Sequence, residues 1–230
     1  MFMASGSLFQ IAVNAHAASV QAPGDGSHPT RPIMAIIAGA ASLEAFINEM
    51  IYHAVALSEA PRLVRSFAKL GGEAIRHRRP VALKFSLAYE VFTGRAIDNQ
   101  TAPFKDLRLL FQLRNALLHL RPVTLALMCP RTHVMKTKQP KIFRRMVSAS
   151  LVRQDALRRN WSGHWLGAMA SPATEDWVCR TASAVAKDVA SMAPGESICS
   201  SRNLTSLREL RENDLKWSLD VMADAFGFPQ

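Results

Sequence analysis

The stretch DLRLLFQLRNALLHLRP, residues 106–122, decides the fold class because it forms one amphipathic helical pattern that stops at a proline. With residues 100° apart on a helix, its leucines gather on one arc and a polar stripe lies opposite. Arg114 lies between the leucine arc and the flanking Phe111, and a cation in that place needs a partner. The arc consists of Leu110, Leu113, Leu117 and Leu120, and the stripe of Arg108, Gln112, Asn115 and His119.

The composition of the whole chain favours helices packed around one core. The 230 residues are 49% apolar, which excludes wholesale disorder and is enough for a full core. The alternation of β-branched residues that is typical of strands is almost absent. We therefore expect an all-α fold in a single compact unit with appendages.

The charge of the chain predicts an anionic partner. A net charge of +10 and a pI of about 10.2 favour binding to nucleic acid, a nucleotide or an acidic protein. The three cysteines, Cys129, Cys179 and Cys199, are far apart and indicate the reducing cytoplasm rather than a disulfide framework. The sequence has no HExxH motif, no Cys/His metal spacing and no Gly-rich phosphate loop, so we predict no metal and no cofactor.

The most apolar window, residues 33–57, is long enough to span a bilayer. Its polar side chains favour the buried helix of a soluble protein, with no membrane. On a helical wheel Glu44 lies between isoleucines, and Asn48 follows one turn later on the same side. We predict that Glu44 pairs with Arg114 and ties two helices together, with Asn48 beside them. The other polar side chains of this window, Ser42, Glu49 and His53, are expected to face water or a partner.

Turn signals divide the rest of the chain. Gly71 and Gly72 are expected to end a helix over residues 58–70, and Gly94 to end one over residues 81–92. Thr174 is the expected N-cap of a helix that runs to residue 192. Three parts are predicted: a flexible or weakly helical extension over residues 1–29, a helical domain over residues 30–195 and an amphipathic helical tail over residues 196–230.

Positive charge is concentrated between residues 131 and 159, where nine Lys or Arg residues stand against one acid, Asp155. Such a cluster can neutralise the phosphates of a nucleic acid, and it can equally be a solvated basic loop. Tryptophans near it can stack on bases or pack in the core. The cations assigned to nucleic-acid binding are Arg131, Lys136, Lys138, Lys141, Arg144 and Arg145, and the tryptophans are Trp161, Trp165 and Trp177.

The sequence RNALLH, residues 114–119, with an apolar helix before it and a proline after it, resembles the RxxxxH signature of the HEPN superfamily. AGAASLEAFINEMI, residues 38–51, looks like the first core helix of bacterial HEPN-like proteins. KFSLAYEVFTGRAIDNQTAPFKDLRLLFQLRNALLHLRP, residues 84–122, is similar to the segment that leads into the motif in that group. The resemblance covers roughly residues 33–194.

This resemblance implies a four-helix up-and-down bundle. In addition to it, the residue patterns predict short helices and an appended amphipathic C-terminal helix. Family members are commonly homodimers in which the motifs of two subunits meet in a shared cleft, and many are metal-independent endoribonucleases. By resemblance, Arg114, Asn115 and His119 are catalytic. The histidine handles protons as the ribose 2′-OH attacks the phosphate, the arginine stabilises the phosphorane charge, and the asparagine orients one of them. Other members have lost catalysis and serve in binding or scaffolding.

Helix geometry limits how these three residues can act together. Arg114 and His119 are separated by about 140° around a regular helix, whereas Asn115 and His119 form an i, i+4 pair. Arg114 can join them only if its side chain curls round or if a dimer partner brings a second copy across the cleft.

Three functions remain open from the sequence. The first is a HEPN-like endoribonuclease of a toxin or defence system, with RNA as substrate and an antitoxin or other protein as partner. The second is a non-catalytic, dimeric HEPN-like module that binds nucleic acid, a nucleotide or a partner protein. The third is a purely structural all-α protein whose tail helix mediates assembly.

Overall fold

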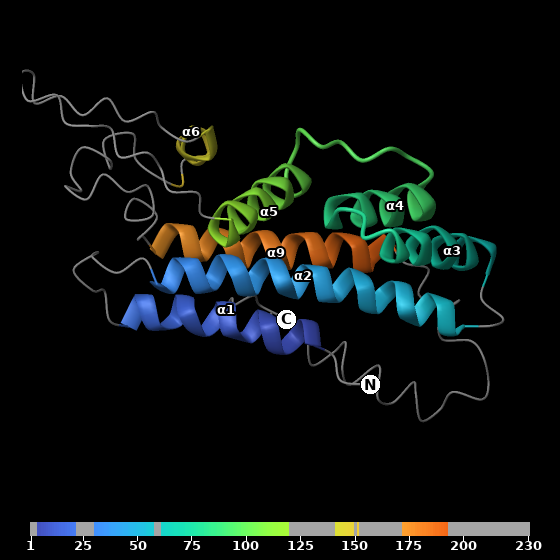
Figure 1. The fold of residues 1–230 in the computed structure, drawn as a ribbon, viewed down its shortest axis with the longest axis horizontal. Helices are drawn as coiled ribbons and strands as arrows, with labels where there is room; N and C mark the ends of the chain where they lie inside the picture. The colour runs from blue at the N-terminus through green and yellow to red at the C-terminus, as the bar shows by residue number, and fades with distance from the viewer. Residues whose placement is uncertain are drawn as a thin grey trace, which may run out of the picture.

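The computed structural model describes residues 4–21, 30–57, 61–119, 141–149, 151 and 172–192. All regular secondary structure in these residues is helical and none of it is a strand, which confirms the predicted all-α class. Figure 1 shows how the helices are arranged. They are α1 (Ala4–Gln21), α2 (Thr30–Ala56), α3 (Arg62–Arg76), α4 (Val81–Thr93), α5 (Phe104–Leu118), α6 (Lys141–Ser148) and α9 (Pro172–Met192).

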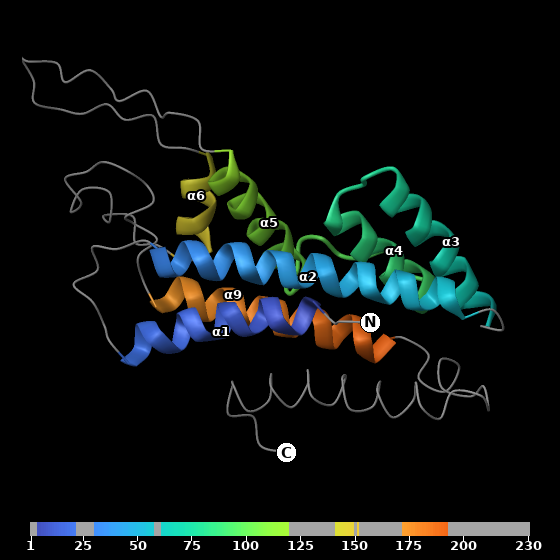
Figure 2. The same cartoon turned by 60° about the horizontal axis from the view of Figure 1, so that its bottom comes forward.

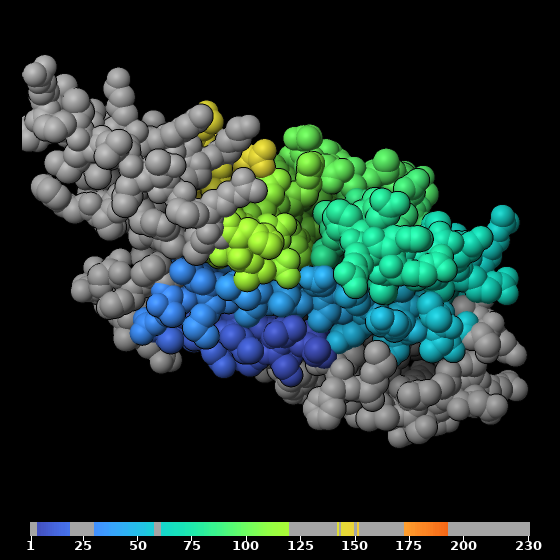
Figure 3. All heavy atoms as spheres, in the orientation of Figure 1, coloured from blue at the N-terminus to red at the C-terminus, as the bar shows by residue number. Residues whose placement is uncertain are grey.

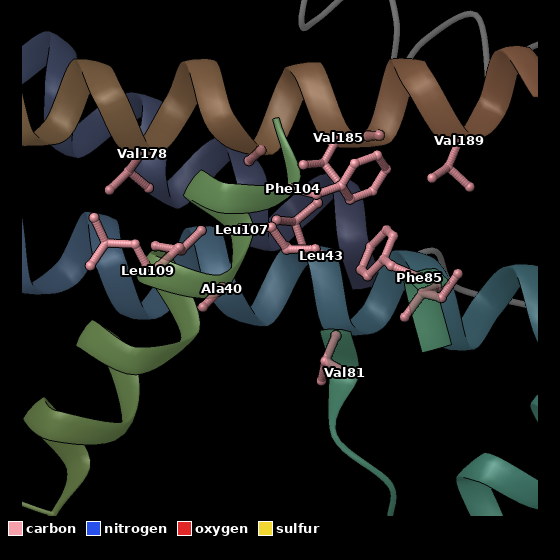
Figure 4. Close-up of a cluster of buried hydrophobic side chains, with 14 of the residues drawn as sticks. Ala40, Leu43, Val81, Phe85, Phe104, Leu107, Leu109, Val178, Val185 and Val189 are labelled. Carbon is pink, nitrogen blue, oxygen red and sulfur yellow. The ribbon is translucent and has the colours of Figure 1, made fainter. Parts of the chain in front are cut away.

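The helix α2 lies at the centre and contacts α1, α3, α4, α5 and α9. On one side α1 runs antiparallel to it, because Ser5 reaches Glu49 near one end and Arg31 reaches the Ala18 carbonyl near the other. The helix α9 runs in the same direction as α2 (Figure 4). The short helices α3, α4 and α5 cover the side of the α2 and α9 pair that α1 leaves free (Figures 1 and 2).

The core forms where these layers meet, and the apolar arc predicted for residues 106–122 is part of it. Leu110 and Leu113 are fully buried and Leu117 is 7% exposed, which confirms the arc for these three leucines. Leu120 lies outside the described residues. Around them, side chains from α2, α4, α5 and α9 interdigitate (Figure 4), among them Ala40, Leu43, Phe85, Phe104, Leu107 and Val185.

The helix α1 differs from the expected flexible or weakly helical extension over residues 1–29. It spans 18 residues, and its Phe9 and Ala12 are buried. Ala12 packs against Ala38 of α2 and Cys179 of α9, where small side chains permit a close approach of three helices. Because the buried face is rich in alanine, its contrast with the exposed face is weak, and the sequence pattern did not reveal a docked helix.

The N-terminus of α1 is held by Glu49 of α2. Its Oε1 accepts the backbone N–H groups of Ala4 at 2.8 Å and Ser5 at 3.3 Å, and its Oε2 accepts the Ser5 hydroxyl at 2.6 Å. The first N–H groups of a helix have no partner within it and carry partial positive charge, so a carboxylate there is stabilising. The expectation that Glu49 and Ser42 face water is wrong, because they are 8% and 4% exposed. Glu49 contacts α1, and the Ser42 hydroxyl donates a hydrogen bond to the Gly39 carbonyl within α2.

The pair of glycines at 71 and 72 does not end a helix, as the sequence suggested, because α3 continues through both to Arg76. Gly71 is instead a packing residue: a Cβ built there would lie 2.6 Å from Cγ1 of Ile51 in α2. Gly94, by contrast, ends α4 as predicted, with a φ of 68° and its N–H donated to the Glu90 carbonyl.

The helix α9 begins at Pro172, two residues before the expected N-cap Thr174, and proline is well suited to a first turn. Thr174 is fully buried inside that turn. Trp177 is 7% exposed and packs in the core, so it cannot stack on a base. Trp161, Trp165 and the predicted helical tail over residues 196–230 lie outside the described residues.

Of the described helices, α2 alone is long and apolar enough to cross a membrane by length and composition. It has 27 residues, and half of its most apolar window is buried inside the protein. Core helices commonly pass the same test, and α2 is the central helix of this core.

The two adjacent glycines of α3 provide a matched test of helix packing. We expect Gly71→Ala to lower the free energy of unfolding by about 1–3 kcal/mol, because the new methyl group meets Ile51. Gly72→Ala has open space around its Cβ and should raise it by about 0.5–1 kcal/mol through helix propensity. Chemical denaturation of both variants measures the difference, and an equal gain in stability would contradict the α2–α3 packing.

The docking of α1 can be followed through the thiol of Cys179. Burial raises its pKa to about 12, with further contributions from Asp176 and Glu175, so little reactive thiolate exists at pH 8. In a variant whose other cysteines are serine, we expect slow labelling by a thiol reagent. Adding Glu49→Ala should speed the labelling, and Glu49→Gln less so because it keeps one acceptor. Rapid labelling before Glu49 is changed would show that α1 does not cover Cys179.

Candidate functional site

A cluster of polar side chains joins α2, α4 and α5. Arg114 Nη2 of α5 lies 3.8 Å from Glu44 Oε2 of α2. One turn further along α2, Asn48 Oδ1 accepts a hydrogen bond from Lys84 Nζ of α4 at 2.8 Å. The sequence-predicted group of Glu44, Asn48 and Arg114 is therefore assembled by the fold, with Lys84 added.

The predicted pairing of Glu44 with Arg114 is confirmed, but it is not a buried pair. The two side chains are 37% and 32% exposed. The reason is that Leu118, which flanks Arg114 on the helical wheel, is 50% exposed, so this side of α5 marks the edge of the core. An ion pair at such an edge is screened by water and contributes at most about 1 kcal/mol.

Lys84 is the member of the cluster that the sequence analysis missed. It is only 5% exposed, although it carries an ammonium group. Burial lowers its pKa, and the nearby carboxylate of Glu44 partly opposes that effect. The signal was present in the sequence, because Lys84 shares the helical face of Val81, Phe85 and Ala88, all of which are buried.

The side chain of Arg114 curls towards the outer face of α5. Its Nη1 donates a hydrogen bond to Asn115 Oδ1 at 3.1 Å, while Nη2 faces Glu44. Asn115 is exposed. The side chain of Arg114 therefore curls round far enough to reach Asn115, as a site shared by the motif residues of one chain requires.

His119 lies at the C-cap of α5, where the helix ends after Leu118. Its backbone N–H donates to the Asn115 carbonyl at 3.0 Å, and its side chain is exposed. Among the described residues, its imidazole forms no hydrogen bond or ion pair with Arg114 or Asn115. The three motif residues therefore lie in the last turn and C-cap of one helix, where Asn115 and His119 are exposed and Arg114 is partly exposed.

This arrangement supports two chemical tasks. An arginine guanidinium can stabilise an anion, and a histidine imidazole can transfer a proton. Within the described ranges, no group of three or more His, Cys, Asp or Glu side chains could hold a metal ion.

Part of the predicted nucleic-acid-binding cluster lies next to the same helix. Arg144 and Arg145 of α6 are exposed, and Arg145 Nη1 donates a hydrogen bond to Gln112 Oε1 of α5. Lys141 is the first residue of α6. Arg131, Lys136 and Lys138 lie outside the described residues.

A groove of about 340 Å³ runs between α5, α6 and the segment that precedes α5. Its lining includes Lys105, Arg108 and Gln112 of α5 and Arg145 of α6. Arg108 and Gln112 belong to the predicted polar stripe of residues 106–122, but no pattern in the sequence indicates that α6 forms the second wall of the groove. In the space-filling view, α5 is exposed above α2 and beside α6 (Figure 3).

Comparison of the chain with protein-family models, with curated proteins and with solved structures finds no match. The functional assignment therefore depends on the residues and their geometry, together with the resemblance at residues 114–119.

The polar cluster predicts a pH-dependent effect of Glu44→Gln. Lys84 ionises near pH 10.4 when unfolded, and burial lowers its folded pKa. Below its folded pKa, Lys84 is charged in the folded protein, and its burial then lowers the free energy of unfolding. Loss of the Glu44 carboxylate removes a charge that offsets this cost. We expect Glu44→Gln to lose about 1 kcal/mol of unfolding free energy at pH 7. The loss should shrink as the pH rises towards 10 and Lys84 becomes neutral.

A double-mutant cycle separates the two partners of Glu44. In a Lys84→Met background, the loss caused by Glu44→Gln should be smaller and nearly independent of pH above neutrality, because only the contact with Arg114 remains. Urea denaturation at several pH values measures both series. Parallel profiles in the two backgrounds would rule out coupling between Glu44 and Lys84.

Proposed function

We propose that this chain is a HEPN-like, metal-independent endoribonuclease whose site is the exposed end of α5. The observation that carries the proposal is the hydrogen bond from Arg114 Nη1 to Asn115 Oδ1. It turns the guanidinium towards the outer face, where Asn115 and, one turn later, His119 are exposed. A cation and a titratable group at one helix end suit phosphoryl chemistry.

In the proposed reaction, the ribose 2′-OH attacks the adjacent phosphorus and transfers its proton to a neutral His119 imidazole. The bond from phosphorus to the 5′-oxygen breaks, and the proton that His119 took up passes to that oxygen, which leaves as a 5′-hydroxyl. The products are a 2′,3′-cyclic phosphate and a 5′-hydroxyl end. Arg114 stabilises the negative charge on the phosphorane, and Asn115 holds the guanidinium in place.

The proposal includes a four-helix up-and-down bundle with additional short helices and an appended C-terminal helix. Three helix directions support such a bundle only if α1 is counted as its first helix, whereas the resemblance makes residues 38–51 of α2 the first core helix. With α1 counted first, α2 runs opposite to α1 and along α9, as the second and fourth helices of such a bundle do. The third position would be shared by α3, α4 and α5, which cover the same side of α2.

We further propose that the active form is a cytoplasmic homodimer in which two copies of the motif meet in a shared cleft. The motif is exposed in the single chain, and a second subunit would bring another Arg114 towards His119. An antitoxin or other protein partner of a toxin or defence system belongs to the same proposal.

A second candidate function is a non-catalytic dimeric module that binds nucleic acid, a nucleotide or a partner protein through the same face. The ion pair at 3.8 Å with Glu44 favours it, because that carboxylate offsets part of the charge of Arg114. Binding by such a module would depend on salt and on the cations of α6, but not on His119.

The ribonuclease proposal predicts that purified protein cuts single-stranded RNA in the presence of EDTA and leaves 2′,3′-cyclic phosphate ends. His119→Ala should lose at least about 100-fold in rate, the usual contribution of a general acid or base. His77→Ala is a matched control, because His77 is also an exposed C-cap residue whose N–H bonds to the carbonyl four residues earlier.

Three outcomes separate the candidates. Cleavage lost in His119→Ala and kept in His77→Ala supports the ribonuclease. Binding of RNA without cleavage, unchanged in His119→Ala, supports the binding module. Cleavage that disappears with EDTA would contradict a metal-independent reaction.

A further inference from the structure

The groove between α5 and α6 is a cationic site outside the proposed catalytic residues. Lys105 and Arg108 of α5 and Arg145 of α6 line it, with Asp106 as the one acid in the lining. All three cations are exposed. None of them forms an ion pair with any part of the chain that the structure describes. Their charge is therefore available to an anionic ligand.

The second wall of the groove is anchored to the core. Met146 of α6 is fully buried in the main hydrophobic cluster, and Arg145 bonds to Gln112 across the groove. Cations from two helices thus face one space, whereas a row of cations on a single surface helix would not enclose a ligand. Gln112 and Asn99 add amide donors and acceptors to the lining.

The groove and the catalytic residues belong to one stripe of α5. Arg108, Gln112, Asn115 and His119 follow one another at intervals of four, three and four residues, so they share a face. Arg108 and His119 are eleven residues apart, which corresponds to about 16 Å along a helix. An extended polymer that is bound in the groove and follows this face of α5 would reach His119.

We infer that the groove binds the sugar-phosphate backbone of single-stranded RNA and directs the strand along α5 to His119. This inference rests on the proposed ribonuclease function, because it names the substrate of that site. A groove of about 340 Å³ is too small to enclose a duplex, so the inference names a single strand. None of the described lining residues is aromatic, so binding depends on phosphates and not on stacked bases, and it is independent of sequence.

The test measures binding of a short single-stranded 2′-deoxy oligonucleotide, which lacks the attacking hydroxyl and cannot be cut by this route. Affinities are taken from fluorescence anisotropy over a series of salt concentrations. For single strands, each phosphate contact contributes about 0.7 to the slope of log K against log salt. The double variant Arg108→Gln/Arg145→Gln should therefore lose about 1.4 from that slope.

The matched control removes two positive charges elsewhere. Arg65 and Lys69 are exposed on α3, so Arg65→Gln/Lys69→Gln changes the net charge equally and should leave the slope unchanged. Loss of Arg145 also removes its hydrogen bond to Gln112 and could loosen α6. Lys105→Gln avoids this effect, because Lys105 makes no side-chain hydrogen bond in the described structure. That variant should lose about 0.7 from the slope.

The outcomes for the groove and for the ribonuclease are distinguishable. Any of three results would overturn the groove inference. The slope could fall equally in the groove and α3 variants, it could stay unchanged in the groove variants, or the protein could bind a duplex as tightly as a single strand. If the slopes change as expected but RNA is never cut, the groove inference stands and the ribonuclease proposal fails. If RNA is cut with an unchanged KM in the groove variants, the ribonuclease stands and the groove inference fails.

Discussion

The structure depends on α2, the central helix, which contributes many buried apolar residues to the core and also carries three strongly polar side chains. Each finds its partner on a different helix. Glu49 accepts hydrogen bonds from the N-terminal N–H groups of α1, and Asn48 accepts one from Lys84 of α4. Glu44 forms an ion pair with Arg114 of α5. Glu49 and Lys84 are buried, and a polar group buried without a partner is costly, so the contacts of these two residues favour one arrangement of the helices around α2.

Close approach between helices is the second requirement, and small residues satisfy it. A Cβ on Gly39 of α2 would lie 2.5 Å from Cγ1 of Val178, and Gly71 receives Ile51 in the same way. At the junction of α1, α2 and α9, Ala12, Ala38 and Cys179 pack together. Glycine within a helix has a cost of about 1 kcal/mol relative to alanine, which tighter packing can offset. Two of the described glycines, Gly39 and Gly71, therefore serve the packing of α2.

Within this frame, α5 divides its surface between stability and function. Its leucines face the core, its outer stripe carries Arg108, Asn115 and His119, and Arg114 lies on the border. The border position lets one guanidinium contact both Glu44 and Asn115. The same ion pair that attaches α5 to α2 therefore sets where the cation of the motif lies, so stability and any chemistry at this helix end are coupled.

The sequence by itself determined the features that depend on local spacing. The helical period of residues 106–122 established the leucine arc and the exposed stripe, Gly94 marked the end of α4, and the apolar setting of Glu44 and Arg114 indicated their pairing. Local spacing is carried by the chain itself, because a helix repeats every 3.6 residues.

Only the tertiary structure decided which partner each remaining group meets. It docked the alanine-rich α1 on α2, assigned Glu49 to a helix N-terminus and made Gly71 a contact rather than a stop. It also buried Lys84 beside Asn48 and placed Arg145 across a groove from Arg108. These contacts join residues that are more than 15 positions apart, with the Lys84–Asn48 bond spanning 36. No periodic pattern along a chain specifies which of its distant segments will meet.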